Sequence, residues 1–416
     1  MADRTDATSG WTPRHWIGTA ALALLALAAT AALWKGPLPL EGLLLRAAAI
    51  DQNVRNGLLR LDPDQFRRVL RLQAVSWSLL GSALLGLLLL PSPLRARWRP
   101  RLLEVSTVLG CSSALFLLLT RCGFEASWYP LDVLMTNPGA LPVFGHRLLW
   151  VWVADGFHAI APSRSYKACY LLSQIGPIVL SVIMVGRWSA LFVRPSLSWV
   201  GQVLLVPMLA TTFNYFTFYD ISIVFFYALC LFLLYERRYV AFALAVGVAT
   251  LNHENAALLV VVAGLETLQY GKRVCAAVTL GSLALYVAAR LGLQYLLPTS
   301  KFVDWRVWTN LIYPLIHPRL VIESALAMVF WWLAAAAVWK YAEPFLRRAA
   351  ILLPMLAAVT YLFGQFHEPR QFDAMIPVVI AFILSFANAQ IANGTGGLAS
   401  DGLAVGGSPE AVIRTH

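Results

Sequence analysis

Apolar segments recur along nearly the whole chain, separated by short polar clusters. Most hold about 17 to 25 residues, which lets a helix cross a hydrocarbon layer about 30 Å thick. The full-length segments lie near 16–34, 74–92, 103–120, 166–186, 197–214, 218–235, 275–296, 321–340, 349–365 and 373–390. Two shorter halves, near 239–251 and 256–269, favour a helical hairpin. The pattern predicts an all-α polytopic transmembrane helical bundle with about twelve crossings, this hairpin included, and with exoplasmic interfacial helices.

The composition excludes a soluble protein of this size. Of the 416 residues, 59% are hydrophobic and 13% are charged, too few to cover a soluble core. The net charge of +11 does not indicate a nucleic-acid partner, because the arginines and lysines are spread over loops. Short basic loops belong on the cytoplasmic side, which places both termini in the cytoplasm of a multi-pass cell-membrane protein. The polar clusters between the other helix ends are then exoplasmic.

The chain divides into three predicted regions. Residues 1–102 form an N-terminal transmembrane pair with an amphipathic interfacial segment, 35–73. This segment is basic although the alternation places it outside; if it is cytoplasmic, one of the first three spans is miscounted. Residues 103–390 form the core, and 391–416 form a glycine-rich, disordered cytoplasmic tail.

Two stretches that do not span the membrane are expected on the exoplasmic side. The first, 121–165, contains an acidic cluster followed by an aromatic amphipathic run from Leu148 to Ile160. The second, 297–320, is polar and rich in proline. Together they could roof a lateral cavity at the membrane surface.

Glu125 and Asp132 are the candidate catalytic residues. Either carboxylate could act as a general base and take the proton of an acceptor hydroxyl. The alternative is that both are loop carboxylates, solvated or paired with Arg121 and Arg147.

Arg147 and Arg370 are candidate phosphate ligands, each at an outer helix end beside His146 or Glu368. A guanidinium group presents fixed paired donors that match phosphate oxygens and keeps its charge. The alternative is an arginine that snorkels towards water or pairs with a local acid such as Glu368.

The cluster Asn252–Asn255 lies at the predicted tip of the hairpin, where strongly polar groups are too costly to face lipid. His253 and Glu254 are therefore expected to line the cavity and bind substrate or a neighbouring loop. A metal held by these residues with Asp220 or His367 is a weak alternative, since no metal-binding spacing is present and the five cysteines are scattered.

Asp220 begins a predicted span directly after a group of aromatic residues. These aromatics are most simply an interfacial belt, with a sugar-stacking platform as the alternative. Asp220 itself is a candidate substrate ligand, or else a cap at the N-terminus of its helix.

The order of the polar motifs is more specific than any one of them. An acidic loop with a nearby tyrosine (Glu125, Tyr129, Asp132) precedes the Phe-x-x-Arg-Leu element 144–148 and the span that Asp220 opens. The hairpin with its polar, acidic tip follows.

Near the end of the core, Glu368-Pro369-Arg370 precedes a helix that contains Pro377. In this order and with this shared sidedness, residues 103–390 resemble the GT-C glycosyltransferase superfamily, membrane enzymes that use polyprenyl-phosphate sugars on the exoplasmic face. The chain differs from the family pattern by its N-terminal addition, 16–92, and by the absence of an Asp-x-Asp pair within 103–390.

The resemblance implies a membrane glycosyltransferase that moves a sugar from a polyprenyl-phosphate donor to an exoplasmic glycolipid or cell-envelope glycan. No cofactor is certain, and a divalent metal is an open alternative. The expected partners are the donor, a lipid or glycan acceptor and membrane lipids. One rival hypothesis is a transporter or lipid flippase with a polar pathway, which internal repeats and mid-span polar residues would favour. The other is a scaffold subunit of an envelope complex without catalysis.

Overall fold

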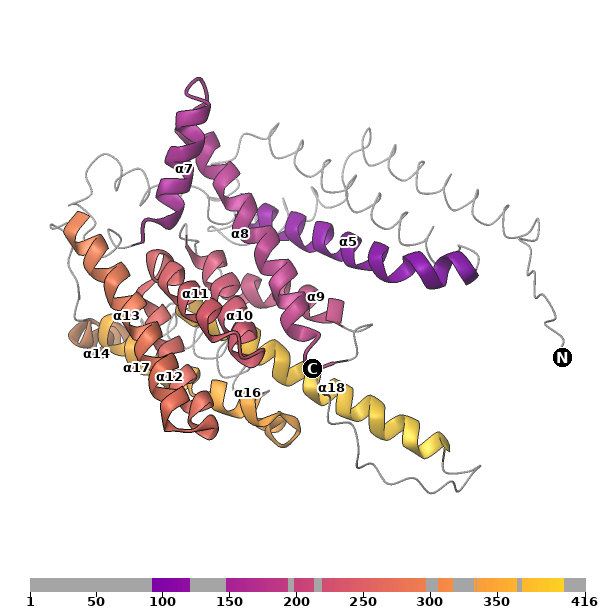
Figure 1. Ribbon diagram of the computed structural model, residues 1–416. Helices are drawn as coiled ribbons and strands as arrows, with labels where there is room; N and C mark the ends of the chain where they lie inside the picture. Colours follow the sequence, from indigo (N-terminus) through magenta and orange to yellow (C-terminus); the bar gives the residue numbers. More distant parts are fainter. Residues whose placement is uncertain are drawn as a thin grey trace. The chain divides into compact units, whose positions relative to one another are not determined.

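The computed structural model describes residues 92–119, 147–193, 198–212, 219–296, 306–316, 333, 335–364 and 369–399. Every regular element within these ranges is a helix, as the sequence predicts (Figure 1). The chain divides into two compact units, Met1–Ala114 and Leu115–His416.

The first unit is described from Ser92 onward, where α5 (Ser92–Leu118) begins. The predicted span 103–120 lies largely within this helix. The basic segment 95–101, expected as a loop, is instead the first part of α5. Pro93 at the second position explains why the helix can start here, since an N–H in the first turn has no intrahelical partner in any case.

In the second unit, α8 is the central packing element of the N-terminal half. The elements are α7 (Leu149–Ile160), α8 (Tyr166–Ser189), α9 (Ser198–Thr212) and α10 (Asp220–Tyr235). Helix α8 packs against the other three. The predicted aromatic run 148–160 is indeed a helix, α7.

The predicted hairpin consists of α11 (Tyr239–Asn252) and α12 (Ala257–Thr267), joined at its tip by His253 and the 3₁₀ turn η5 (Glu254–Ala256). His253 has an extended backbone, which ends α11. After η6 (Leu268–Tyr270), α13 (Lys272–Leu296) packs against both α11 and α12 (Figure 1).

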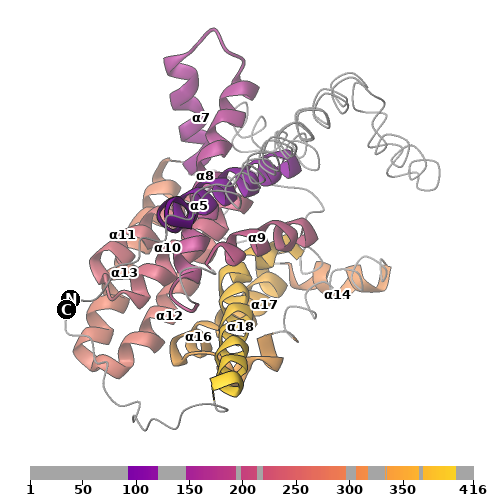
Figure 2. The ribbon, with the colours of Figure 1, turned by 90° about the vertical axis from the view of Figure 1, so that its right-hand side faces the viewer.

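The C-terminal elements are α14 (Val307–Ile316), η7 (Trp339–Tyr341), α16 (Pro344–Ala349), α17 (Leu352–Phe363), η8 (Pro369–Met375) and α18 (Ile376–Ala399). Helix α18 packs against α8 and α9, and α9 lies beside it in Figure 2. The turn η8 packs against α9, α10 and α17. It thereby brings Arg370 to the N-terminal end of α10. Helix α18 continues to Ala399, into the segment predicted as a disordered tail from 391.

Four helical stretches in the described part are long and apolar enough to cross a membrane: Tyr166–Ser189, Lys272–Leu296, Pro344–Phe363 and Arg370–Gln390. Shorter apolar helices accompany them, among them Asp220–Tyr235 and Tyr239–Asn252. The protein is therefore embedded in a membrane.

The surface of α13 fits this environment. Leu280, Leu283, Val287 and Leu291 follow one another at helical spacing and are all exposed. The buried positions of the same helix, such as Val278, Ser282 and Leu293, face the protein. An exposed apolar stripe of this kind is favourable in contact with lipid and costly in water.

Candidate functional site

A bidentate ion pair joins the start of α7 to the tip of the hairpin. Arg147 Nε donates to Glu254 Oε2 at 3.0 Å, and Arg147 Nη2 donates to Glu254 Oε1 at 2.5 Å. The Arg147 side chain is 8% exposed, and that of Glu254 is 31% exposed. Desolvation alone would raise the pKa of Glu254, but the Arg147 guanidinium outweighs it and holds this pKa well below the usual value.

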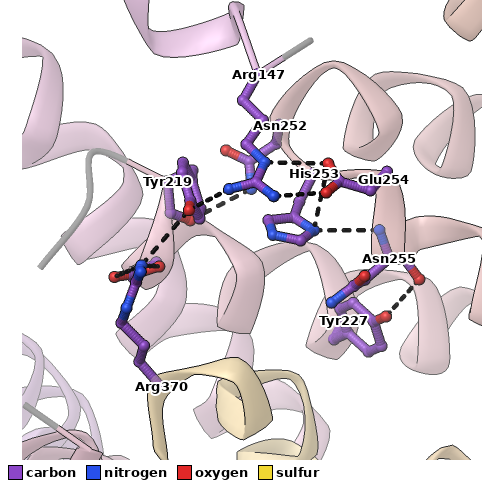
Figure 3. A network of polar contacts seen from close by, with 9 residues as sticks. Arg147, Tyr219, Tyr227, Asn252, His253, Glu254, Asn255 and Arg370 are labelled. Carbon is purple, nitrogen blue, oxygen red and sulfur yellow. Dashed lines mark hydrogen bonds and ion pairs between the residues drawn. The ribbon is translucent and has the colours of Figure 1, made fainter. Parts of the chain in front are cut away.

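Tyr219 connects this pair to a second one (Figure 3). Its buried hydroxyl accepts a hydrogen bond from Arg147 Nη1 and another, at 3.5 Å, from Arg370 Nη1. Arg370 Nη1 also lies 3.4 Å from both carboxylate oxygens of Asp220. The Arg147 guanidinium in addition covers the Tyr219 ring, 4.4 Å from its centroid. Arg147 and Arg370 are 223 positions apart in the sequence, yet both donate to this one phenol oxygen.

The hairpin tip is held in shape by buried hydrogen bonds. His253 Nδ1 accepts the backbone N–H of Asn255 at 3.1 Å and so caps η5. The Tyr227 hydroxyl, from α10, donates to the Asn255 carbonyl at 2.6 Å. Burial, reinforced by the charge of Arg147, lowers the pKa of His253 to about 3. The imidazole is therefore neutral near pH 7, and its 3.8 Å approach to Glu254 is no ion pair.

Asn252 anchors the same tip to α7 and α10. Its Oδ1 accepts from the indole Nε1 of Trp150 at 2.9 Å, and its Nδ2 donates to the Tyr219 carbonyl at 3.3 Å. The Ser222 hydroxyl lies 2.6 Å from Asn252 Oδ1. Since all of these groups are buried, each bond also removes the penalty of an unsatisfied polar atom. These hydrogen bonds of Asn252 fix the hairpin tip, and with it Glu254, relative to α7 and α10.

Five residues predicted as site members meet in this cluster: Arg147, Asp220, His253, Glu254 and Arg370. The other four, Glu125, Asp132, His146 and Glu368, lie outside the described residues, as does His367. Within the described ranges, no group of three or more His, Cys, Asp or Glu residues is placed to hold a metal ion.

The structure bears on two of the alternatives left open by the sequence. Each arginine pairs with a carboxylate in this structure: Arg147 with Glu254, and Arg370 with Asp220. Tyr219 occupies the position before the first residue of α10, so Asp220 is not the cap; it lies in the first helical turn, where a negative charge is favourable.

Three residues of the region escaped sequence reasoning. The sequence predicts Tyr219 as part of an interfacial aromatic belt, yet it is buried between the two arginines. Arg290 in α13 and Asp373 in η8 are also buried. For Arg290 and Asp373 the sequence does offer a signal: a charged residue inside or at the edge of an apolar segment marks a functional candidate by default.

A second, partly buried ion pair lies at the other end of α12. Arg348 Nε of α16 donates to Glu266 Oε2 at 2.6 Å, and Gln269 Nε2 donates to Glu266 Oε1 at 2.5 Å. Residues 254 and 266 are twelve positions apart along η5 and α12, which corresponds to about 18 Å of helix. This pair is therefore separate from the cluster around Tyr219 and serves as its natural control.

Comparisons of the chain with protein-family models, with curated proteins and with solved structures find no match.

Proposed function

We propose that the protein is a membrane glycosyltransferase that moves a sugar from a polyprenyl-phosphate donor to an exoplasmic glycolipid or cell-envelope glycan. The observation that carries the proposal is the convergence of Arg147 and Arg370 on the hydroxyl of Tyr219. Two guanidinium groups held this close repel one another unless anions neutralise them. A phosphate group offers several oxygens to such a pair, in the paired geometry that guanidinium recognises.

In the resting protein, each of these arginines forms an ion pair with a carboxylate. The donor phosphate would take the place of Glu254 on Arg147, since this carboxylate is the partly exposed member of its pair. Arg370 stays oriented by Asp220 and Tyr219. The hairpin tip, stiffened by Asn252 and His253, keeps Glu254 within reach to re-form the pair when the phosphate leaves.

The proposed reaction is direct displacement at the anomeric carbon. The acceptor oxygen forms a bond to that carbon while the bond to the phosphate oxygen breaks, and the phosphate keeps the electron pair. The acceptor proton passes to Asp132 or Glu125, the predicted bases. Arg147 and Arg370 stabilise the charge that develops on the departing phosphate.

The proposed topology has about twelve crossings, cytoplasmic termini and an exoplasmic cluster. Cysteines introduced at Ser127 and Arg99, in a background without native cysteines, distinguish the two faces. An impermeant thiol reagent should label intact cells at position 127 and leave position 99 unlabelled; the reverse pattern overturns the orientation.

Donor binding to purified protein tests the proposed site. Arg147→Lys and Arg370→Lys keep the charge but lose the planar fork, so each should weaken binding of a prenyl-phosphate sugar about tenfold or more. Arg348→Lys is the matched control, because it alters a comparable Arg–Glu pair away from the cluster. Equal binding by all variants, or no binding by the wild type, would refute the phosphate site.

A transporter is the second candidate, and one observation favours it. Arg290 and Asp373 are buried within helical stretches long and apolar enough to span the membrane. Buried ionisable groups at such positions are typical of substrate or proton pathways. Reconstitution in vesicles, with separate detection of sugar transfer and donor movement, distinguishes the two functions.

A further inference from the structure

Asp373 is a fully buried carboxyl group that the proposed sugar transfer does not use. It lies in η8, three residues after Arg370, and is 0% exposed. Neither of its carboxylate oxygens accepts a hydrogen bond from the residues that the structure describes. An ionised carboxylate in such a place has lost its hydration without replacement, which strongly disfavours the charged form.

The surroundings of Asp373 are defined by the elements that pack against η8. From α10, Asp220 contributes a second carboxylate, and from η8 itself Arg370 contributes a guanidinium group. From α9, the neighbouring polar group is the hydroxyl of Thr212. Helices α17 and α18 contain no Asp, Glu, Lys, Arg or His within their bounds. Among the described residues, Asp373 therefore faces one positive and one negative side chain.

The positive charge is already engaged. Arg370 Nη1 lies 3.4 Å from both oxygens of Asp220, and these two charges compensate one another. A second ionised carboxylate beside them would leave one buried negative charge in excess and would repel Asp220. Two carboxyl groups in this situation are stabilised when they share one proton.

Thr212 does not compensate an ionised Asp373 in this structure. Its hydroxyl could favour the ionised form only by donating its proton to the carboxylate. That proton is instead donated to the carbonyl of Leu209 at 2.8 Å, and the oxygens of Asp373 have no hydrogen-bond partner among the described residues.

We propose that Asp373 is a proton-binding site that carries a proton in the resting protein. Asp220 stays ionised and pairs with Arg370. The site exchanges its proton only when η8 or its packing against α9 and α10 rearranges, because the carboxyl is closed to solvent in this conformation. Movement of η8 would also displace Arg370, so proton exchange at Asp373 is coupled to the position of this arginine.

Infrared spectroscopy of the purified full-length protein, in a detergent without ester groups, tests the proposal. The carbonyl stretch of a protonated carboxyl is separate from the carboxylate bands and shifts in heavy water. Near neutral pH, the wild-type minus Asp373→Asn difference spectrum should contain this band with the intensity of one group per chain. Thr212→Val should keep the band, because the Thr212 hydroxyl donates to the Leu209 carbonyl and not to Asp373. Asp155→Asn removes an exposed carboxylate that binds Tyr166 and should leave the band unchanged.

Two results would overturn the assignment. The first is a band that is absent from the wild type or that persists in a folded Asp373→Asn protein, with folding checked by gel filtration and thermal unfolding. The second is a band that appears only without sodium and disappears when sodium is added, since a metal cation would then neutralise Asp373 in place of the proton.

Discussion

Arg147 and Glu254 form a pair whose two members differ in exposure: the guanidinium is 8% exposed, whereas the carboxylate is 31% exposed. An anion that approaches from solvent therefore meets Glu254 before it meets Arg147. The pair can open by rotation of the glutamate alone, while Tyr219 continues to hold the arginine. This asymmetry is the structural basis for the exchange of a carboxylate for a phosphate.

The first prediction concerns the strength of this pair. Glu254→Gln should reduce the free energy of unfolding by about 2 kcal/mol, because it leaves a buried guanidinium without its counter-charge. Arg147→Gln should cost a similar amount. The double variant should cost less than the sum, and the difference measures the coupling between the two residues. Denaturant unfolding in detergent micelles provides the four free energies; strictly additive costs would show that the pair contributes no coupling.

The second prediction concerns the phenol oxygen between the arginines. Tyr219→Phe keeps the ring under Arg147 but removes the acceptor shared by both guanidinium groups. Hydrogen bonds to charged groups are worth about 1.5 to 3 kcal/mol, so a loss in that range is expected. Tyr235→Phe is the matched control, since that hydroxyl makes an exposed bond to Glu343 at 3.1 Å. The same unfolding assay should show a change below about 0.5 kcal/mol for the control.

The third prediction concerns pH. In the folded protein the pKa of His253 is about 3, while an unfolded histidine has a pKa of about 6.5. Between these values the unfolded chain binds a proton that the folded protein does not. Stability should therefore fall as the pH drops below about 6.5, with a contribution of about 1.4 kcal/mol per pH unit from this residue.

His253→Asn isolates that contribution. An asparagine oxygen can replace Nδ1 as the acceptor for the Asn255 N–H, so the cap is retained while the titration is lost. The variant should unfold with a shallower dependence on pH in this window. A His253→Asn protein whose slope equals that of the wild type would show that His253 is protonated in the folded state.

The fourth prediction concerns the contact between α8 and α9. A Cβ atom at Gly201 would lie 1.9 Å from Ser189 Oγ and 3.2 Å from Ile380 Cγ2. Gly201→Ala should therefore destabilise the protein by about 1 to 3 kcal/mol through overpacking. At Gly176, in α8, no described atom outside the helix backbone lies within 4 Å of the position that a Cβ would take, so Gly176→Ala should be neutral or stabilising. Thermal unfolding of both variants checks the contrast.

The helices could be predicted because their signal is local. The apolar segments near 166–186 and 275–296 correspond to α8 and α13, and the two apolar halves correspond to α11 and α12. The start of α5 could not be located this way, since its first turns are basic and are helical all the same.

The partners of the charged residues could not be predicted. Tyr219 and Arg370 are 151 positions apart, and Arg147 and Glu254 are 107 positions apart. A single sequence shows that each residue is costly in an apolar segment, but not which opposite charge compensates it. Tyr219 carries no charge and stands among other aromatics, so its role emerges only from the packing of η8 against α10.

The central claim is that the cluster around Tyr219 binds a phosphate whose sugar is then transferred. Its most direct test uses purified protein in lipid vesicles, a prenyl-phosphate donor with a labelled sugar, and a lipid extract that supplies acceptors. We predict that the label moves to a new product in the wild type, and that Arg370→Lys reduces this transfer about tenfold or more while Arg348→Lys does not. Label that crosses the bilayer yet stays on the donor would contradict the account and identify a transporter.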